Sequence, residues 1–550
     1  MAKENLRDMY IKMICVHELP LYFIERDLFT EIMECLDPNF VKWSQATVKE
    51  DLIRVYQLEK EKLKKDLEYV DRLSLTSHLW TTTQRMVYVC LTGHYVDPSW
   101  NFQRVVLNFF EVEPPNTEGV ITAKIAECLQ EWGFQNKICT LTLDNATSNS
   151  AGVRKLKEVV ENGGSKLLLG GSFFHVPCGA MLLNLLVKDG LTVIENFISK
   201  ARDFFKYLRI STARQLKFKK IAKLMNVNIS NGLCLDVSTK WNSTFIMLEH
   251  ALVLRTVFKK YQDEDPFFIW LPSDEEWDRC GSICKFLGIF YDIACIFSNP
   301  VHPTSNLFLL ELCRLKEFIY ENCTNEQDYI REISFKMKRK FDKYWRETSI
   351  LLSIAAVLDP RNKMALVKYC FPKIYDIREV ETEVKTVNDT LHDLYNWYAS
   401  STPQKSMDTK SSSPLKGNFE WRQFKHFKTT AYKTQTEKSE LDIYLEEKEI
   451  DDDDYEDFNV LEWWCLNEIK YKILSRMARD ILSIQLASVL PKLTFITDCP
   501  IVNENISSYS PSIVEAYICT GDWIRKMDPL LNFEVDDDFL HLNFEDCETL

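Results

Sequence analysis

The spacing of apolar residues changes along the chain from a helical period to a strand period. Residues 1 to 68 repeat apolar side chains every three or four positions, and the segment 18–38 places four of them on one face: Phe23, Phe29, Ile32 and Leu36. From Asp71 the period becomes two, in the runs DRLSLTSHLW, RMVYVCLTGHYVD and FQRVVLNFFEVE. We therefore predict a helical N-terminal module followed by three successive strands.

A helix and a fourth strand come next. Ile121, Ile125, Leu129 and Trp132 fall at helical spacing, after a capping position at Asn116 or Thr117 and before Gly133, which suits a left-handed C-cap. The run ICTLTL, residues 138–143, then predicts a strand that ends at an Asp and a polar turn. Three strands, a crossover helix and a fourth strand form the opening of a ribonuclease-H-like sheet, in which the first and fourth strands are neighbours.

This adjacency brings the end of LSLTSH close to the end of TLTLD. Two carboxylates placed there would hold a pair of divalent metal ions for attack on a phosphodiester. In the alternative interpretation, Asp144 belongs to an Asx turn at the surface of some other α/β sheet. Both interpretations stay open on the pattern alone.

The rest of the chain is mostly helical in pattern. The fold class we predict is α/β, a ribonuclease-H-like mixed sheet interrupted by a large all-α insertion, with an N-terminal helical module and a C-terminal region. The predicted segments are 1–68 (helical module), 69–190 (first part of the sheet fold), 191–400 (helical insertion), 401–440 (Ser/Thr/Lys-rich linker), 441–525 (C-terminal region) and 526–550 (acidic tail).

Composition fits a folded protein dominated by helices. The 550 residues include only 15 Gly and 18 Pro, and 46% are hydrophobic. Glu4 and Asp8 interrupt the position of a signal peptide, and no run of about 18 apolar residues is found, so we expect a soluble intracellular protein without a membrane partner. The 17 Cys are too dilute for a disulfide scaffold, and Cys280 and Cys284 have no further ligand at zinc-finger spacing.

Charge is unevenly distributed. The net charge of −14 disfavours nucleic acid as a partner when it is averaged over the chain. However, the segment from Lys200 to Lys223 holds nine basic residues and one acid, a local charge of +8, whereas 445–457 and the tail are acidic. Such a basic segment can follow phosphates through counterion release, although a solvated helix face is the plainer interpretation.

Many short sequence strings resemble those of one protein family, and they occur in the same order along the chain. They include LSLTSHLWTTTQRMVYVCLTGHYVD, LTLDNATSN, FFHVPCGAMLLNL, LCLDVSTKWNSTFIMLE, FSNPVHPTSNLF, IAAVLDPRNKM, SELDIYLEE, FNVLEWW and EAYICTGDW. Over nearly the whole chain the sequence resembles the plant type of hAT-superfamily transposase, the RICESLEEPER-like group. The resemblance implies the interrupted ribonuclease-H-like sheet, a hAT dimerisation region in the C-terminal segment, and two-metal catalysis by two Asp and one Glu.

The resemblance also implies that most of the catalytic site is degenerate. Asp144 matches the second Asp, but His78 stands at the first acid position and Lys492 at the Glu position. A neutral imidazole is a poor ligand for Mg²⁺, and an ammonium group repels the metal. At the Cys-x-x-His motif of the family this chain has Cys178, but Met181 stands at the His position. His175 either substitutes for the missing histidine or is a buried core histidine. The BED zinc finger of the family has no counterpart in these residues, so we expect a shortened gene product or loss of the main DNA reader.

Two further sets of residues follow from the resemblance and from the charge pattern. The expected DNA-binding residues are Lys240 and Trp241, whose indole matches a base-stacking position of the family, together with Arg209, Arg214, Lys217, Lys219 and Lys220. Core packing is the alternative for Trp241. The expected dimerisation residues, some of them also core, are Trp463, Trp464, Leu474, Met477 and Ile481.

We therefore expect a transposase-derived nuclear protein that binds DNA, forms a homodimer or higher homo-oligomer, and is catalytically inactive. No cofactor is expected, and Mg²⁺ is needed only if catalysis is retained; no small-molecule substrate is expected. One alternative is an active cut-and-paste transposase that uses two divalent metals. The other is a protein-interaction scaffold that does not bind DNA, suggested by the acidic run from Asp451 to Asp454.

Overall fold

A computed structural model of the chain describes residues 2–36, 40–81, 86–114, 117–143, 150–227, 235–236, 241–344, 349–401, 438–450, 458–487 and 509–527. Nearly all of the predicted acidic tail and of the predicted linker lies outside these residues. Contacts divide the chain into two compact units: the first comprises 1–94, 104–165 and 488–550, and the second comprises 95–103 and 166–487. The bounds of the six predicted segments stay predictions.

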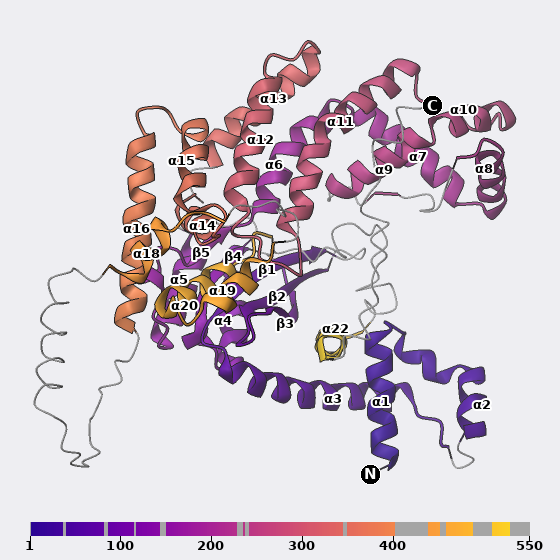
Figure 1. The fold of residues 1–550 in the computed structure, drawn as a ribbon. Coiled ribbons are helices and arrows are strands. Elements are labelled where there is room, and N and C mark those ends of the chain that lie inside the picture. Colours follow the sequence, from indigo (N-terminus) through magenta and orange to yellow (C-terminus); the bar gives the residue numbers. More distant parts are fainter. Residues whose placement is uncertain are drawn as a thin grey trace, which may run out of the picture. The chain divides into compact units, whose positions relative to one another are not determined.

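The sheet has five strands in the order β3-β2-β1-β4-β5 (Figure 1). They are β1 (Leu73–Thr81), β2 (Val87–Val96), β3 (Phe102–Val112), β4 (Ile138–Leu143) and β5 (His175–Pro177). β1 pairs antiparallel with β2 and parallel with β4, with Ser77 opposite Leu143. The four strands predicted from the sequence are confirmed, as is the adjacency of the first and fourth.

The first unit also contains the helices of the N-terminal module, the helices that flank β4 in the sequence, and one late helix. They are α1 (Ala2–Val16), η1 (Leu21–Glu25), α2 (Asp27–Leu36), α3 (Gln45–Asp66), η2 (Leu67–Tyr69), α4 (Glu118–Trp132), η3 (Gln135–Lys137), α5 (Ala151–Asn162) and α22 (Pro511–Met527). α4 is the predicted crossover helix. Gly133 ends it in the left-handed conformation, with φ 71° and ψ 27°, as expected, and Thr117 is its N-cap without a side-chain capping bond.

The second unit contains the helical insertion and most of the C-terminal region. Its helices are η4 (Leu168–Gly171), α6 (Gly179–Thr192), α7 (Glu195–Arg209), α8 (Thr212–Leu224), α9 (Trp241–Val253), α10 (Arg255–Glu264), α11 (Asp274–Phe297), α12 (Phe308–Asn322), α13 (Asp328–Tyr344), α14 (Ser349–Val357), α15 (Lys363–Ile374), α16 (Val380–Ser401), α18 (Glu440–Glu446), α19 (Val460–Asn467) and α20 (Lys472–Leu482). The prediction of a long helical stretch is confirmed.

α11 is the central apolar helix of this unit. A capping box between Ser273 and Glu276 begins it, and Cys280 and Cys284 lie within it, buried, with their sulfurs 3.9 Å apart. Among the described helices, α11 has the length and composition that would allow a membrane crossing, a test that the core helix of a soluble protein also passes. Its Trp277, Phe290 and other buried side chains fit a core helix.

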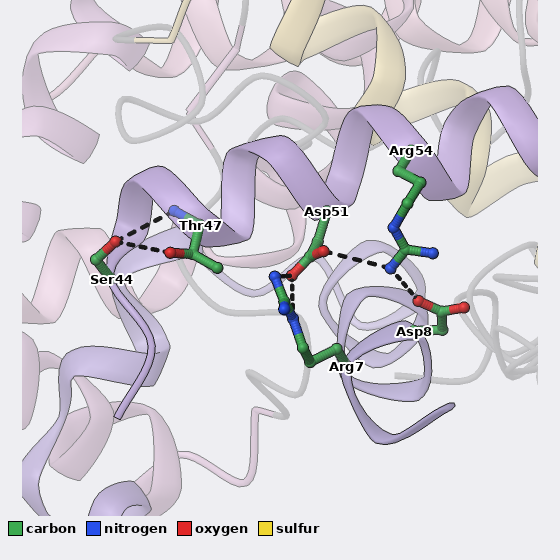
Figure 2. A network of polar contacts seen from close by, with 6 residues as sticks. All are labelled: Arg7, Asp8, Ser44, Thr47, Asp51 and Arg54. Atoms are coloured by element: carbon green, nitrogen blue, oxygen red, sulfur yellow. Dashed lines mark hydrogen bonds and ion pairs between the residues drawn. The ribbon is translucent and has the colours of Figure 1, made fainter. Parts of the chain in front are cut away.

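Ion pairs join α1 to α3 in the N-terminal module (Figure 2). The buried carboxylate of Asp51 on α3 accepts hydrogen bonds from Arg7 on α1, at 2.6 Å, and from Arg54, which also pairs with Asp8. Ser44 caps α3 by accepting from the backbone N–H of Thr47. About two helical turns further along α3, the buried carboxylate of Glu59 forms ion pairs with Lys12 and Lys62.

The last helix, α22, completes the core of the first unit. The Tyr517 hydroxyl donates to the carbonyl oxygens of Ile14 and Leu19 at the end of α1, at 3.1 and 3.0 Å. The Trp523 ring stacks on Tyr56 of α3, and its indole N–H donates to the Val106 carbonyl oxygen of β3 at 2.7 Å. The N-terminal helices and a helix more than 400 residues later therefore share one core.

The segment 18–38 differs from its prediction. It divides into η1 and α2, because Arg26 between them is extended. Phe23 and Phe29 contact each other at a centroid distance of 5.6 Å, but Ile32 and Leu36 point to solvent with exposed fractions of 58% and 76%. The apolar face predicted there is therefore only half covered by the module.

Candidate functional site

The candidate catalytic site lies where β1 and β4 run side by side toward the end of β4. In the described residues their parallel pairing reaches Ser77 opposite Leu143, and the next residues in the sequence are His78 and Asp144. Asp144 lies outside the described residues. The pairing therefore places β1 and β4 side by side, as the catalytic interpretation requires. It is described as far as the residue that precedes each candidate ligand.

His78 is half-buried on β1 and lies opposite Cys90 of β2. The next histidine inward, His94, accepts or donates a 3.0 Å hydrogen bond with the Thr76 hydroxyl. Burial, together with nearby Arg104, lowers the pKa of His94 to about 3, so this imidazole is neutral at physiological pH. At the first acid position β1 carries the His78 imidazole in place of a carboxylate, and this donor does not suit a two-magnesium site.

Lys492, the residue at the predicted Glu position, lies outside the described residues. The segment that leads to it is held firmly in the second unit. Thr304 donates to Gln485 at 3.1 Å and accepts from the backbone N–H of Leu486 at 3.1 Å. The Leu486 carbonyl oxygen accepts from the N–H of Gly179, the first residue of α6, at 2.7 Å. The family-like string FSNPVHPTSNLF therefore serves to anchor this segment.

The residues of the Cys-x-x-His comparison take ordinary structural positions. His175 begins β5 and is buried, Cys178 is buried at the N-cap of α6, and Met181 is half-buried in its first turn. In the part of the chain that the structure describes, no three His, Cys, Asp or Glu side chains gather in a way that could hold a metal ion.

The basic segment 200–223 forms α7 and α8, and its cations divide into two groups. Four are engaged within the protein. Lys200 pairs with Glu276 at 2.7 Å and Arg202 with the buried side chain of Asp236 at 2.6 Å. Two of the predicted DNA-binding residues, Arg214 and Lys217, also belong to this engaged group.

The Arg214 guanidinium lies over the Tyr207 ring at 3.7 Å and donates to the Tyr207 carbonyl oxygen. Lys217 donates to the Glu264 carbonyl oxygen at 2.7 Å. Both side chains join α8 to its neighbours, so they contribute to the local fold. The inner face of α8 is closed by buried Phe218, which packs on Phe258 of α10.

The second group of cations is exposed. Lys219, Lys220 and Lys223 lie on the outer side of α8, and Lys206 is exposed on α7. Residues at spacing of three and four lie on one side of a helix, so Lys219, Lys220 and Lys223 present their charges together. Arg209 is also exposed, at the end of α7. This outer face of α8 is the candidate phosphate-binding surface.

The second predicted DNA-binding feature is only partly described. Lys240 lies outside the described residues. Trp241 begins α9 with an exposed fraction of 8%, which agrees with the core-packing alternative. A stacking role for its indole would require a rearrangement, and it stays a prediction.

The predicted dimerisation residues lie mainly in the core of the second unit. Trp464, Leu474, Met477 and Ile481 each have an exposed fraction of 0%, and Trp463 is half-buried. The Trp464 indole N–H donates to the Leu358 carbonyl oxygen at 2.9 Å, which ties α19 to the end of α14. The stripe along α20 is therefore covered within the protomer and is not a free surface.

Sequence reasoning missed a buried polar centre in the string LDPRNK. The fully buried carboxylate of Asp359 accepts from Arg361 at 2.7 Å and from the Asn306 amide at 2.9 Å. Nearby, Lys363 donates to the Glu447 carbonyl oxygen at 2.6 Å and lies over the Tyr444 ring. The acid and base adjacent in the sequence were the available signal. This centre joins the helical insertion to the start of the C-terminal region.

Family models match four stretches of the chain. They are the ZBED1 RNase-like domain at residues 76–173, the ZBED1 RNase-like helical domain at 176–286, the hAT-like transposase RNase-H fold at 306–398 and the hAT family C-terminal dimerisation region at 440–524. The expected ribonuclease-H-like fold with a helical domain and a C-terminal dimerisation region is confirmed.

Whole-chain relatives carry the same assignment. The zinc finger BED domain-containing protein RICESLEEPER 2 of Oryza sativa subsp. japonica is 33% identical over 535 residues, 94% of this chain and 73% of the relative. DAYSLEEPER of Arabidopsis thaliana is 31% identical over 95% of this chain and 74% of its own length. A putative AC transposase of Zea mays is 31% identical over 94% of this chain and 65% of its own. The chain therefore belongs to the hAT transposase family.

Proposed function

We propose that this chain is a transposase-derived, self-associating nuclear protein that binds DNA and has lost two-metal catalysis. The single observation that carries the proposal is His78 on β1, one residue beyond Ser77, which pairs with the residue that precedes Asp144. Lys492 at the expected Glu position supports it. With one carboxylate in place of three, the residues do not fit a pair of Mg²⁺ ions, and no step of metal-assisted cleavage is derived for them.

DNA binding is supported by the outer face of α8. Its three lysines are exposed, clustered on one side of a helix, and separate from the cations that hold α7 and α8 together. Each phosphate neutralised by such a lysine releases condensed counterions, so the affinity should depend steeply on salt. The relatives named for a BED zinc finger or a transposase agree with nucleic acid as the partner and the nucleus as the location.

The test for DNA binding is a salt titration of the full chain with duplex DNA. The triple variant K219E/K220E/K223E should bind at least tenfold more weakly at about 150 mM salt, and the slope of log K against log salt should fall by about 3. The matched control, K285E/K368E/K385E, reverses three other exposed lysines and should change binding much less. Equal loss in both variants, or no loss in either, would contradict the role of α8. No binding of duplex DNA by the natural chain would favour the interaction-scaffold alternative.

The test for lost catalysis is DNA strand cleavage with Mg²⁺ or Mn²⁺. We expect no metal-dependent cleavage by the natural chain, because an imidazole and an ammonium replace two oxygen ligands. Cleavage that disappears in Asp144→Asn would refute the proposal and favour the active-transposase alternative. Isothermal titration of Mn²⁺ into the natural chain and into this variant gives a second readout, and we expect no difference between them.

A further inference from the structure

α2, labelled in Figure 1, belongs to the N-terminal module. It carries an apolar stripe that the module leaves uncovered. None of its ten residues is buried. Leu28, Ile32 and Leu36, spaced by four, have exposed fractions of 74%, 58% and 76%. α2 is held to the module through Phe29, whose ring contacts Tyr10 of α1 at 5.2 Å.

The polar residues of α2 lie away from this stripe. At 100° per residue, Leu28, Ile32 and Leu36 span about 80° of the helix surface, and Cys35 lies beside them. The three acids, Asp27, Glu31 and Glu34, gather on another side. An isolated exposed leucine needs no explanation, but an ordered row of three on one helix indicates a surface that is covered in the assembled protein.

The stripe is symmetric about its centre. Ile32 has a leucine four residues before it and another four residues after it. When two such helices pack antiparallel across a twofold axis, Ile32 meets Ile32 of the second copy and Leu28 meets Leu36. Self-complementarity of this kind is what an isologous interface requires, and the acids remain at the side of the helix pair.

Two apolar helices of the dimerisation region, α20 and α22, are already covered. The stripe of α20 is buried in the second unit. α22, the last helix of the matched region, is buried by α1, α3 and β3, and a Cβ at Gly521 would lie only 2.7 Å from the Cys15 carbonyl oxygen. α22 therefore packs against the N-terminal module that carries α2. The exposed stripe of α2 thus belongs to a unit whose core is completed by a helix of the dimerisation region.

We infer that the Leu28–Ile32–Leu36 face of α2 is a self-association surface, which pairs antiparallel with the same face of a second copy of this chain. The inference rests on the proposed self-association and names its surface. Two ten-residue helices bury less than the roughly 1,600 Å² of a standard interface, so this contact alone gives a weak dimer or acts together with other contacts.

The test measures the oligomeric state of the full chain by sedimentation over a range of concentrations. Ile32→Asp places two carboxylates at the twofold axis, and we expect the dimer dissociation constant to rise at least tenfold. Since Ile32 is exposed in the protomer, circular dichroism and thermal unfolding should be unchanged. The control is Leu466→Asp on α19, an exposed residue of the dimerisation region with an exposed fraction of 78%, which should leave the dimer intact.

A second measurement reports the geometry. In a background without the exposed Cys35 and Cys465, Ile32→Cys should form an intermolecular disulfide under a mild chemical oxidant, whereas Leu58→Cys on α3 should not. An undisturbed dimer in Ile32→Asp refutes the α2 surface but leaves self-association standing; loss in Leu466→Asp alone assigns the interface to α19. A natural chain that is monomeric at all concentrations refutes the proposed self-association as well, without bearing on DNA binding by α8.

Discussion

α20 and α2 have similar patterns in the sequence and opposite environments in the structure. Both are short helices with an apolar stripe and a polar side. The stripe of α20, including Leu474 and Ile481, is fully buried within the protomer, whereas Leu28 and Leu36 of α2 are about three-quarters exposed. Sequence periodicity therefore shows that a helix has an apolar face. Only the tertiary fold decides whether the same chain covers that face.

The largest expected difference between the two helices is in stability. Trp464 packs beside α20 with its indole fully buried, so Trp464→Ala should lower the free energy of unfolding by about 4 kcal/mol through loss of packing and of its hydrogen bond to Leu358. Ile32→Ala on α2 should change it by less than about 0.5 kcal/mol in the monomer. Urea unfolding below the dimerisation concentration measures both, and similar costs would remove the contrast.

A smaller effect tests how tightly α22 is enclosed. Gly521→Ala forces a methyl group against the Cys15 carbonyl oxygen, and we expect a loss of about 2 kcal/mol. The control is Gly281→Ala on α11, where the nearest atom would lie 3.9 Å away; it should stabilise the protein by about 0.5–1 kcal/mol through helix propensity. Thermal unfolding checks both, and a stabilising Gly521→Ala would mean that α22 is packed more loosely than described.

The smallest of the three effects is a pH dependence of the α22 packing. Burial raises the pKa of the Glu515 carboxyl, and hydrogen bonds from Asn108 and Tyr56 only partly offset this. A raised pKa in the folded state means that this group stabilises the fold at low pH and that the contribution is lost as the pH rises through the folded value. Glu515→Gln should flatten this slope in urea unfolding measured from pH 4 upward; an unchanged slope would assign it to another group.

The local parts of the fold could be predicted from the sequence. The alternation in β1 to β4, the helical spacing in α4 and the left-handed Gly133 depend on neighbouring residues, and each of these features is confirmed. The parallel pairing of β1 with β4 followed from the order of elements.

Whether a charged or apolar side chain is free could not be predicted, because its partners come from remote parts of the sequence. Lys217 is engaged by Glu264, 47 residues away, and Asp359 is satisfied by Asn306, 53 residues away. The exposed lysines of α8 carry the same charge as Lys217, but they lie on the outer side of the helix, where no acidic partner is found among the described residues. For the candidate catalytic site, the type of residue at each expected ligand position was more informative than the arrangement of the strands. The histidine at position 78 can be read from the sequence alone.

The packing of α22 against α1 has a consequence for how the chain is made. During synthesis, α1 and α3 leave the ribosome long before Tyr517 and Trp523, which close their core. The first unit must therefore wait, with apolar surface uncovered, while more than 400 intervening residues are translated. Uncovered apolar surface of this kind makes a nascent chain prone to aggregation until its final helix arrives. A premature stop codon upstream of α22 would consequently damage the earliest helices as much as the last.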